Sequence, residues 1–139
     1  MKNLLISLII ILALVSCTSK EVKVVEEYFQ SGSPKKVMDY KVSMGDSIPL
    51  HRADFHENGE TRMEGSFVDG KRDGEWMSWY ANGVIWSKGY FKDGLRTGKS
   101  WAYYPSGKLY LQGSYENGKK VGEWLVFDED GIVTGKESF

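Results

Sequence analysis

The chain is poor in the residues that form disulfides, metal sites and nucleic-acid surfaces. Its 139 residues include one cysteine, two histidines and three prolines. A single cysteine excludes an intramolecular disulfide. Basic and acidic side chains nearly balance, at 18 and 19, so overall charge gives no indication of nucleic-acid binding. The length is that of one domain.

Long apolar runs are absent after residue 16. Residues 4–15 form a short apolar run behind Lys2, broken only by Ser7. It is too short to span a bilayer comfortably, but it is typical of a signal-peptide core. It ends in Leu14-Val15-Ser16-Cys17, which resembles the lipobox of bacterial lipoproteins. The alternative is an uncleaved anchor with a membrane-buried thiol.

The lipobox resemblance implies a location and a tether. Residues 1–16 would be removed as a signal peptide, and Cys17 would carry lipid, including palmitate. Residues 17–21 would form a short tether that anchors the protein in the cell envelope. Lipoproteins retained at an inner membrane often carry Asp after the cysteine. Because Thr18 stands there, we expect an outer-membrane location if the cell has an outer membrane.

Glycine and aromatic residues are abundant, and they follow a repeat of 24 residues. Glycine fills 16 positions and aromatic residues make up 14% of the chain. The step is seen in Gly59, Gly83, Gly107 and Gly131. A strict period of this length indicates one small structural unit stacked on copies of itself. Such arrays usually bind partners and seldom carry out chemistry.

Each repeat is expected to contain two strands and two turns. Pairs such as Asn82-Gly83 and Asp93-Gly94 readily adopt the positive φ angles of tight hairpins. The runs between them are aromatic and β-branched, as in strands. The sequence therefore predicts an all-β fold, an elongated antiparallel meander that follows a cleaved signal helix. The expected strands are 51–56, 61–67, 75–80, 85–91, 99–104, 109–115, 123–127 and 132–138.

The array is expected to divide into a regular and a degenerate part. Residues 51–139 form the regular repeats, and residues 22–50 a degenerate first copy. In that copy Tyr28 and Tyr40 match Phe55 and Phe67 at a spacing of 27. The longer spacing predicts about three extra residues in the turn near residues 44–49.

Three glycines lie inside expected strands, and alternation places them on one face. Glycine weakens a strand unless something must approach its backbone closely. We expect Gly65, Gly89 and Gly113 to be packing glycines, each covered by an aromatic ring such as Trp79 or Tyr103 of a neighbouring strand.

The other face mixes aromatic and polar side chains, and alternation assigns Trp86, Lys88 and Tyr90 to it. No sequence outside the repeats is expected to cover it, so the sheet is expected to be single-layered or rolled upon itself. An exposed aromatic row is a candidate binding surface. Its candidate residues are Trp86, Tyr110, Tyr80, Tyr104, Trp76 and Trp124.

The segment from Tyr115 to Trp124 resembles the variant MORN repeat. That repeat consists of an aromatic residue, two residues, Gly, three residues, Gly, one residue and Trp. Residues 67–76 fit equally well, whereas in the copy that begins at Phe91 the tryptophan is replaced by Ser100. The resemblance covers residues 51–139 well and 22–50 weakly, and it implies the same β-meander. Bacterial proteins of this kind are commonly called YwqK-family antitoxins, and related repeats serve as membrane-proximal or scaffold elements.

Catalytic and metal-binding patterns are not found. His51 and His56 flank one expected strand, and His56 occupies the position of Tyr80 and Tyr104. A zinc site needs further ligands nearby. No nucleophile motif stands out. We therefore expect no enzymatic activity, no cofactor and no metal.

Basic residues recur at one turn of successive repeats and are expected to form a ridge along one margin of the sheet. They are Lys71, Arg72, Arg96, Lys119 and Lys120. The simplest interpretation is that these basic side chains are solvated turn residues that also discourage aggregation at the sheet edge. The alternative is contact with anionic lipid head groups or a cell-wall polymer.

These observations favour a non-enzymatic envelope lipoprotein whose sheet is a protein-interaction or scaffold surface. One alternative is a module that binds glycan or peptidoglycan through the aromatic row. Another is an antitoxin or immunity protein that neutralises a partner toxin. The expected partners are the membrane, through the lipid, and a protein, with no nucleic acid. The unpaired outer strands also make an edge-to-edge homodimer plausible.

Overall fold

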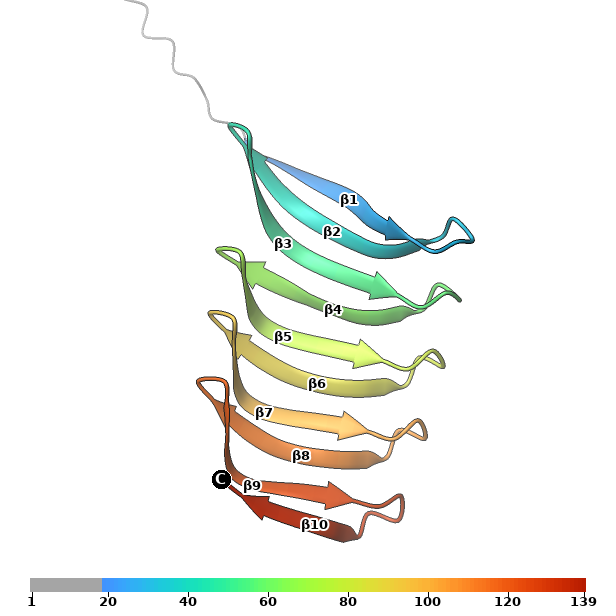
Figure 1. The fold of residues 1–139 in the computed structure, drawn as a ribbon, viewed down its shortest axis with the longest axis vertical. Helices are drawn as coiled ribbons and strands as arrows, with labels where there is room; N and C mark the ends of the chain where they lie inside the picture. Colours follow the sequence, from blue (N-terminus) through green and yellow to red (C-terminus); the bar gives the residue numbers. More distant parts are fainter. Residues whose placement is uncertain (1–18) are drawn as a thin grey trace, which may run out of the picture.

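The computed structural model describes residues 19–139. The expected signal peptide and the lipidation site at Cys17 lie outside this part of the chain. The described residues form one sheet in which each strand pairs antiparallel with its neighbours in sequence (Figure 1). The strands are β1 (Lys20–Tyr28), β2 (Pro34–Ser43), β3 (Asp46–Phe55), β4 (Thr61–Val68), β5 (Lys71–Trp79), β6 (Ile85–Lys92), β7 (Leu95–Tyr103), β8 (Leu109–Glu116), β9 (Lys119–Phe127) and β10 (Val133–Ser138). The predicted all-β meander is confirmed.

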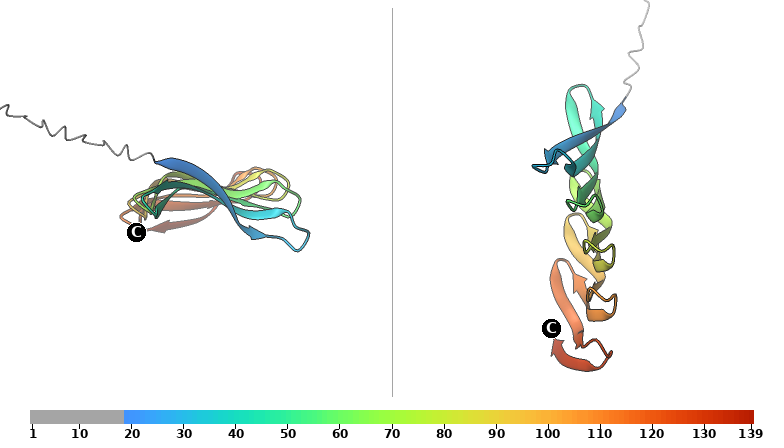
Figure 2. Two further views of the ribbon diagram at one scale, coloured as in Figure 1. Left: turned by 90° about the horizontal axis from the view of Figure 1, so that it is seen from above. Right: turned by 90° about the vertical axis from the view of Figure 1, so that its right-hand side faces the viewer.

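The sheet is a single elongated layer that twists along its length (Figures 1 and 2). No segment of residues 19–139 packs as a second layer on either face. Within the same residues, no helix has the length and apolarity needed to cross a membrane. Both faces of the sheet therefore carry side chains that contact solvent or one another.

Two kinds of turn alternate along the chain. One is a two-residue hairpin whose residues both have positive φ, as at Asp93 (49°) and Gly94 (86°). This backbone matches the twist of the flanking strands and favours Asp-Gly and Asn-Gly. The other is a longer turn closed by two backbone hydrogen bonds. In the second repeat these run from Tyr80 N to Val84 O (2.8 Å) and from Gly83 N to Tyr80 O (3.0 Å).

The strands that follow the two-residue turns begin earlier than predicted. β5 begins at Lys71 and not at residue 75, because Lys71, Arg72 and Asp73 already pair with β4. At Gly74 (φ 79°) the ladder is interrupted and the strand bends. Figure 1 shows this bend near the start of β5, β7 and β9.

The degenerate first repeat forms two strands, β1 and β2, whose pairing is irregular around Glu27. Its extra residues were predicted in the turn near residues 44–49, and this prediction is wrong. The turn is the two-residue pair Met44-Gly45, and the following residues belong to β3. An irregularity in the β2–β3 register, between Asp39 and Tyr40, takes up one residue. Long strands are favoured over a long loop because each added residue pair satisfies backbone hydrogen bonds.

Candidate functional site

Two tryptophans lie directly over strand glycines. A Cβ atom on Gly65 would be 2.2 Å from the Trp76 ring, and one on Gly113 would be 2.1 Å from the Trp124 ring. The indoles are only 5% and 4% exposed, although the sheet has a single layer. Gly65 and Gly113 are therefore packing positions, as predicted. The rings that cover them come from Trp76 and Trp124, so the predicted cover by Trp79 or Tyr103 is wrong.

Each of these indoles is held between two further rings and beneath a cation. Trp76 lies edge-to-face against Phe67 at 5.3 Å and Phe91 at 6.0 Å between ring centroids. Cζ of Arg72 lies 4.2 Å from the centroid of the Trp76 ring. The indole N–H donates to the carbonyl oxygen of Ser66 (3.2 Å). Edge-to-face pairs and cation–π contacts add to the burial of the ring.

The same arrangement recurs around Trp124 two repeats later. Its ring contacts Tyr115 at 5.0 Å and Phe139 at 6.5 Å between centroids. Nζ of Lys120 lies 4.6 Å from the ring centroid. Its N–H donates to the carbonyl oxygen of Ser114 (3.2 Å).

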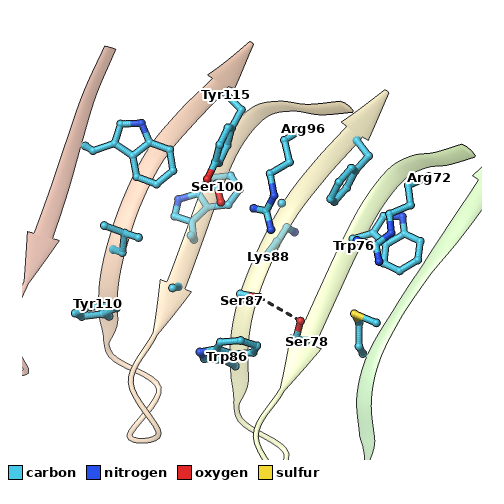
Figure 3. Close-up of a pocket in the computed structure, with 17 residues that line it drawn as sticks. Arg72, Trp76, Ser78, Trp86, Ser87, Lys88, Arg96, Ser100, Tyr110 and Tyr115 are labelled. Atoms are coloured by element: carbon cyan, nitrogen blue, oxygen red, sulfur yellow. Dashed lines mark hydrogen bonds between the residues drawn. The ribbon is translucent and has the colours of Figure 1, made fainter. Parts of the chain in front are cut away.

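The repeat between them lacks its indole. Ser100 stands 24 residues after Trp76 and 24 before Trp124, and it pairs with Gly113 as Trp76 pairs with Gly89. The nearest atoms to a Cβ atom on Gly89 would be Ser100 Oγ at 3.6 Å, then Arg96 Nη1 and Ser100 Cβ at 4.0 Å each. The prediction that an aromatic ring covers Gly89 is therefore wrong. The space left by the missing ring forms part of a groove of about 300 Å³ (Figure 3).

The groove is aromatic and basic. Its lining includes three basic residues and no aspartate or glutamate: Met63, Arg72, Trp76, Ser78, Trp86, Ser87, Lys88, Gly89, Phe91, Arg96, Ser100, Trp101, Ala102, Tyr110, Leu111, Tyr115 and Trp124. Lys88 is paired with Glu75 at 2.7 Å. Among residues 19–139, neither Arg72 nor Arg96 forms an ion pair. Partial burial, and then the positive charges of Arg52 and Arg96, lower the pKa of the Arg72 guanidinium.

Trp86 and Tyr110 lie at the end of the groove where β6 and β8 begin (Figure 3). Their side chains are 52% and 41% exposed. Each is the extra residue of a bulge, because Ser78 and Trp79 pair with Ser87 and Ile85, and the β7–β8 register shifts in the same way. The bulges interrupt strict alternation, so Trp86 lines the same groove as Trp76.

Tyr80 and Tyr104, two further members of the predicted aromatic row, have a structural role. Their hydroxyl groups donate to the carbonyl oxygens of Tyr103 and Phe127, each at 2.8 Å. The rings also contact Trp86 at 6.4 Å and Tyr110 at 5.1 Å. The two tyrosines join neighbouring repeats and support the exposed rings.

The expected basic ridge separates into two groups. Lys71 and Lys119 begin β5 and β9 directly after two-residue turns and are exposed. The other three cations lie over aromatic rings. Arg96 is between Phe91 and Tyr115, with its Cζ 5.4 and 5.2 Å from the ring centroids, and Arg72 and Lys120 occupy the corresponding places.

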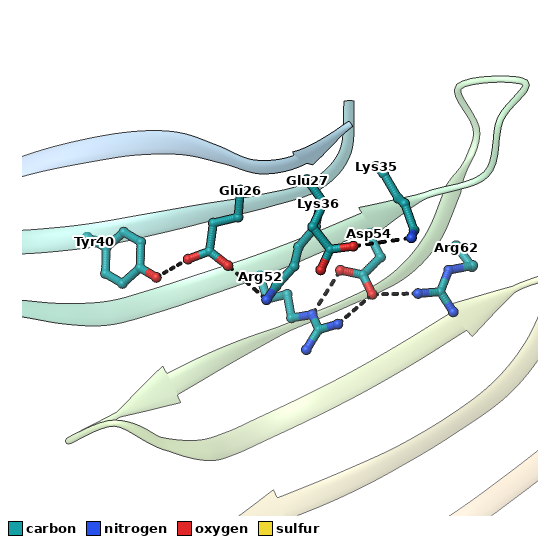
Figure 4. Close-up of polar contacts among 8 residues, drawn as sticks. All are labelled: Glu26, Glu27, Lys35, Lys36, Tyr40, Arg52, Asp54 and Arg62. Atoms are coloured by element: carbon teal, nitrogen blue, oxygen red, sulfur yellow. Dashed lines mark hydrogen bonds and ion pairs between the residues drawn. The ribbon is translucent and has the colours of Figure 1, made fainter. Parts of the chain in front are cut away.

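The N-terminal strands carry a polar cluster that the sequence did not reveal (Figure 4). Asp54 is 1% exposed. It accepts two hydrogen bonds from Arg52 (2.8 Å each) and one from Arg62 (2.7 Å). Nearby, Lys36 pairs with Glu26 at 2.8 Å, and the Tyr40 hydroxyl donates to the same carboxylate. The cluster is satisfied by its own members and is a structural element.

The histidines have local partners. Nε2 of His56 lies 2.8 Å from the carbonyl oxygen of Trp79, which repeats the Tyr80 contact one repeat earlier. His51 lies 3.8 Å from Asp39. In residues 19–139 no three His, Cys, Asp or Glu side chains gather closely enough to hold a metal ion.

Comparison with known proteins supports the repeat assignment. Residues 72–93 and 96–117 match the family described as "MORN repeat variant". No curated protein matches the chain at a significant level. A solved structure, the "Glycosylation Associate Protein (Gap123) complex from Streptococcus agalactiae", aligns with 16% sequence identity and a TM-score of 0.39. The alignment covers 67% of this chain and 17% of that one, so the likeness is partial.

Proposed function

We propose that this protein is a non-enzymatic binding module of the cell envelope, and that the groove between Trp76 and Trp124 holds a protein partner. The observation that carries the proposal is the composition of the groove. It combines exposed rings, Trp86 and Tyr110, with two arginines that lack a carboxylate. Aromatic side chains and arginine are the residues most enriched where proteins bind one another strongly.

The repeat architecture supports a binding role. A single layer of stacked hairpins offers a long surface whose repeats can each contribute contacts. Two matches to the MORN repeat variant within residues 72–117 agree with such an array. The expected lipid on Cys17 would hold this surface at a membrane of the envelope.

Glycan binding is the second candidate, and the exposure of Trp86 and Tyr110 favours it. Sugar rings stack on exposed aromatic faces, and these two rings lie near one end of the groove. The two arginines make the groove less suited to a neutral glycan, because desolvating an arginine without an anionic partner costs free energy.

Site-specific photo-cross-linking in living cells tests the proposal. A photoreactive benzoylphenylalanine is placed at Trp86, in the groove, or at Glu123, whose register puts it on the other face beside the buried Trp124. We expect protein adducts of discrete mass from position 86 and none from position 123. The position-86 adducts should disappear with Arg96→Glu.

Two results contradict the proposal. Adducts of the same masses from both positions indicate non-specific proximity, and adducts unaffected by Arg96→Glu place the partner outside the groove. If no protein adducts form, and the wild-type chain co-sediments with cell wall while Trp86→Ala does not, the second candidate is favoured. The anchor is tested separately, because Cys17→Ser should release the protein from membranes and abolish palmitate labelling.

A further inference from the structure

The groove lacks one aromatic ring for which its neighbours provide a complete setting. At the two equivalent positions, Trp76 and Trp124 cover a strand glycine. At the third position Ser100 leaves Gly89 without a covering ring, and the nearest atom to a Cβ there is 3.6 Å away. The floor of an indole site is therefore present, and a flexible side chain, Arg96, approaches it in place of a ring, with Nη1 4.0 Å from the Cβ position.

The sides of this site are present as well. Phe91 and Tyr115 stand on either side of the vacancy, where Phe67 and Phe91 flank Trp76. Arg96 lies between these two rings, and its Nη1 is 4.0 Å from the Cβ position on Gly89, so its guanidinium reaches into the space that an indole fills in the other two repeats. A planar ring entering here would displace the guanidinium from the floor of the slot. With Arg96 then lying over the ring, as Arg72 lies over Trp76, the ring would meet two ring edges and one guanidinium, which are the contacts that hold the native indoles.

The acceptor for an indole N–H also has a counterpart. Trp76 and Trp124 donate to the carbonyl oxygens of Ser66 and Ser114, and the corresponding residue in the middle repeat is Tyr90. This favours tryptophan over phenylalanine as the entering side chain, because only the indole supplies a donor.

The positive charge of the groove indicates which residues should stand beside the entering tryptophan in the partner's sequence. Arg72 and Arg96 flank Phe91, with Cζ atoms 5.3 and 5.4 Å from its ring centroid. No carboxylate lines the groove. Arginine binds carboxylates through paired hydrogen bonds, so acidic residues beside the tryptophan would complement both guanidiniums.

We infer that the groove binds a segment of a partner protein that inserts a tryptophan side chain over Gly89 and places an adjacent carboxylate against Arg72 and Arg96. The inference rests on the proposed function and names its ligand chemistry. A sugar ring is thicker than an indole and stacks on an open aromatic face, whereas Gly89 lies at the bottom of a slot between two rings.

Peptide binding to the full chain, purified in detergent, tests the inference. The probe is the peptide Gly-Ser-Asp-Trp-Glu-Ser-Gly, and two control peptides replace its Trp by Ala or its acidic residues by Lys. Binding is followed through the backbone amide resonances of Gly89 and Ser100. We expect the probe to shift both resonances and to bind about tenfold more tightly than either control, the effect of losing one such contact.

Two variants locate the binding site. Ser100→Trp fills the vacancy with the chain's own indole and should abolish binding of the probe. Arg96→Gln removes one cation without filling the groove and should weaken binding about tenfold. Tyr28→Phe changes an exposed ring on β1 that does not line the groove and should leave the affinity unchanged. Circular dichroism checks that each variant is folded, and Arg96→Gln keeps the test decisive if Ser100→Trp does not fold.

The inference is overturned if the Ala-substituted peptide binds as well as the probe, or if a folded Ser100→Trp variant binds it normally. It is also overturned if cell-wall oligosaccharide or anionic vesicles shift the Gly89 resonance and the probe does not. Cross-linking at Trp86 without probe binding refutes only this inference and leaves the proposed function standing. Probe binding without any cellular adduct refutes the proposed function alone.

Discussion

The aromatic repeats and the first strands use the same sheet position in opposite ways. Arg52 stands 24 residues before Trp76. Its partner in the preceding strand is Met38, whereas the partner of Trp76 in the preceding strand is Gly65. In the first strands this position supports a buried carboxylate, Asp54. Later in the chain it supports an indole on a bare backbone, except at Ser100. A single-layered sheet can therefore be consolidated by an ion-pair cluster or by a ring on glycine.

The two arrangements, a ring on glycine and a buried carboxylate, require different neighbouring residues. The ring needs a glycine beneath it and rings beside it, all set by the 24-residue period. The carboxylate needs two guanidiniums, which here come from β3 and β4. Ser100 has the neighbours of the first solution without its central ring, and this is why the groove opens there.

Removal of an indole should have the largest effect on stability. Trp124→Ala should lower the free energy of unfolding by about 3 kcal/mol, because it removes a buried ring and leaves a cavity. Ser100→Ala at the equivalent position should change it by less than about 0.5 kcal/mol. Urea unfolding followed by circular dichroism measures both. Equal effects at the two positions would contradict the comparison.

Adding a methyl group beneath the ring should have a somewhat smaller effect. In Gly65→Ala the new Cβ would lie 2.2 Å from the Trp76 ring, so the indole must move, at a cost of about 2 kcal/mol. In Gly89→Ala the nearest atom is 3.6 Å away, and we expect a change within about 0.5 kcal/mol. Urea unfolding of the two variants measures both changes. A loss of about 2 kcal/mol for Gly89→Ala as well would mean that no space remains above Gly89.

The polar cluster should respond to removal of its charge. Asp54→Asn leaves Arg52 and Arg62 without their anion and should lower the free energy of unfolding by about 2 kcal/mol. This is less than for a wholly buried pair, because both guanidiniums reach solvent. Asp39→Asn, at a half-exposed carboxylate that pairs with Lys23 at 3.6 Å, serves as the control. Similar losses for the two variants would show that burial of Asp54 adds nothing.

Acid should destabilise the first strands through Glu26, with the smallest effect of the series. Hydrogen bonds from Lys36 and then Tyr40 lower the pKa of Glu26 from its ordinary value of 4.5. Because the pKa of Glu26 is lower in the folded protein than in the unfolded chain, Glu26 stabilises the fold fully at pH values above its unfolded pKa. This stabilisation is lost as the pH falls towards the pKa of the folded state. Melting temperature against pH should therefore decline less steeply below 4.5 for Glu26→Gln. Parallel curves would exclude this contribution.

Most of the fold follows from the sequence because the period fixes both the turns and the strands. Asp-Gly and Asn-Gly mark the two-residue hairpins, and the internal glycines mark the packing positions. The covering rings were misassigned, because the bend at Gly74 sets which side chain reaches Gly65. The sequence predicts that Trp86 is exposed, which the structure confirms. It does not predict that Trp86 lines the same groove as Gly89, because a bulge reverses the face that alternation predicts.

The sequence indicates the missing ring at Ser100 but not the polar cluster around Asp54. Asp54, Arg52 and Arg62 come from two strands of irregular register, and their pairing depends on a three-dimensional contact that no motif encodes. Ser100 was visible as a departure from the repeat. Its meaning required the structure, because only the rings of Phe91 and Tyr115 and the position of Arg96 show that an indole site remains.

The central claim is that Gly89 and Ser100 form an indole site that lacks its indole. A double-mutant cycle measures this directly, through the free energy of unfolding of Ser100→Trp, Gly89→Ala and the double variant. We expect Ser100→Trp to stabilise the protein by about 1 kcal/mol when Gly89 is present, and to lose this gain or destabilise the protein when Gly89→Ala blocks the floor. If Ser100→Trp has the same effect in both backgrounds, its ring does not lie on Gly89 and the claim is wrong.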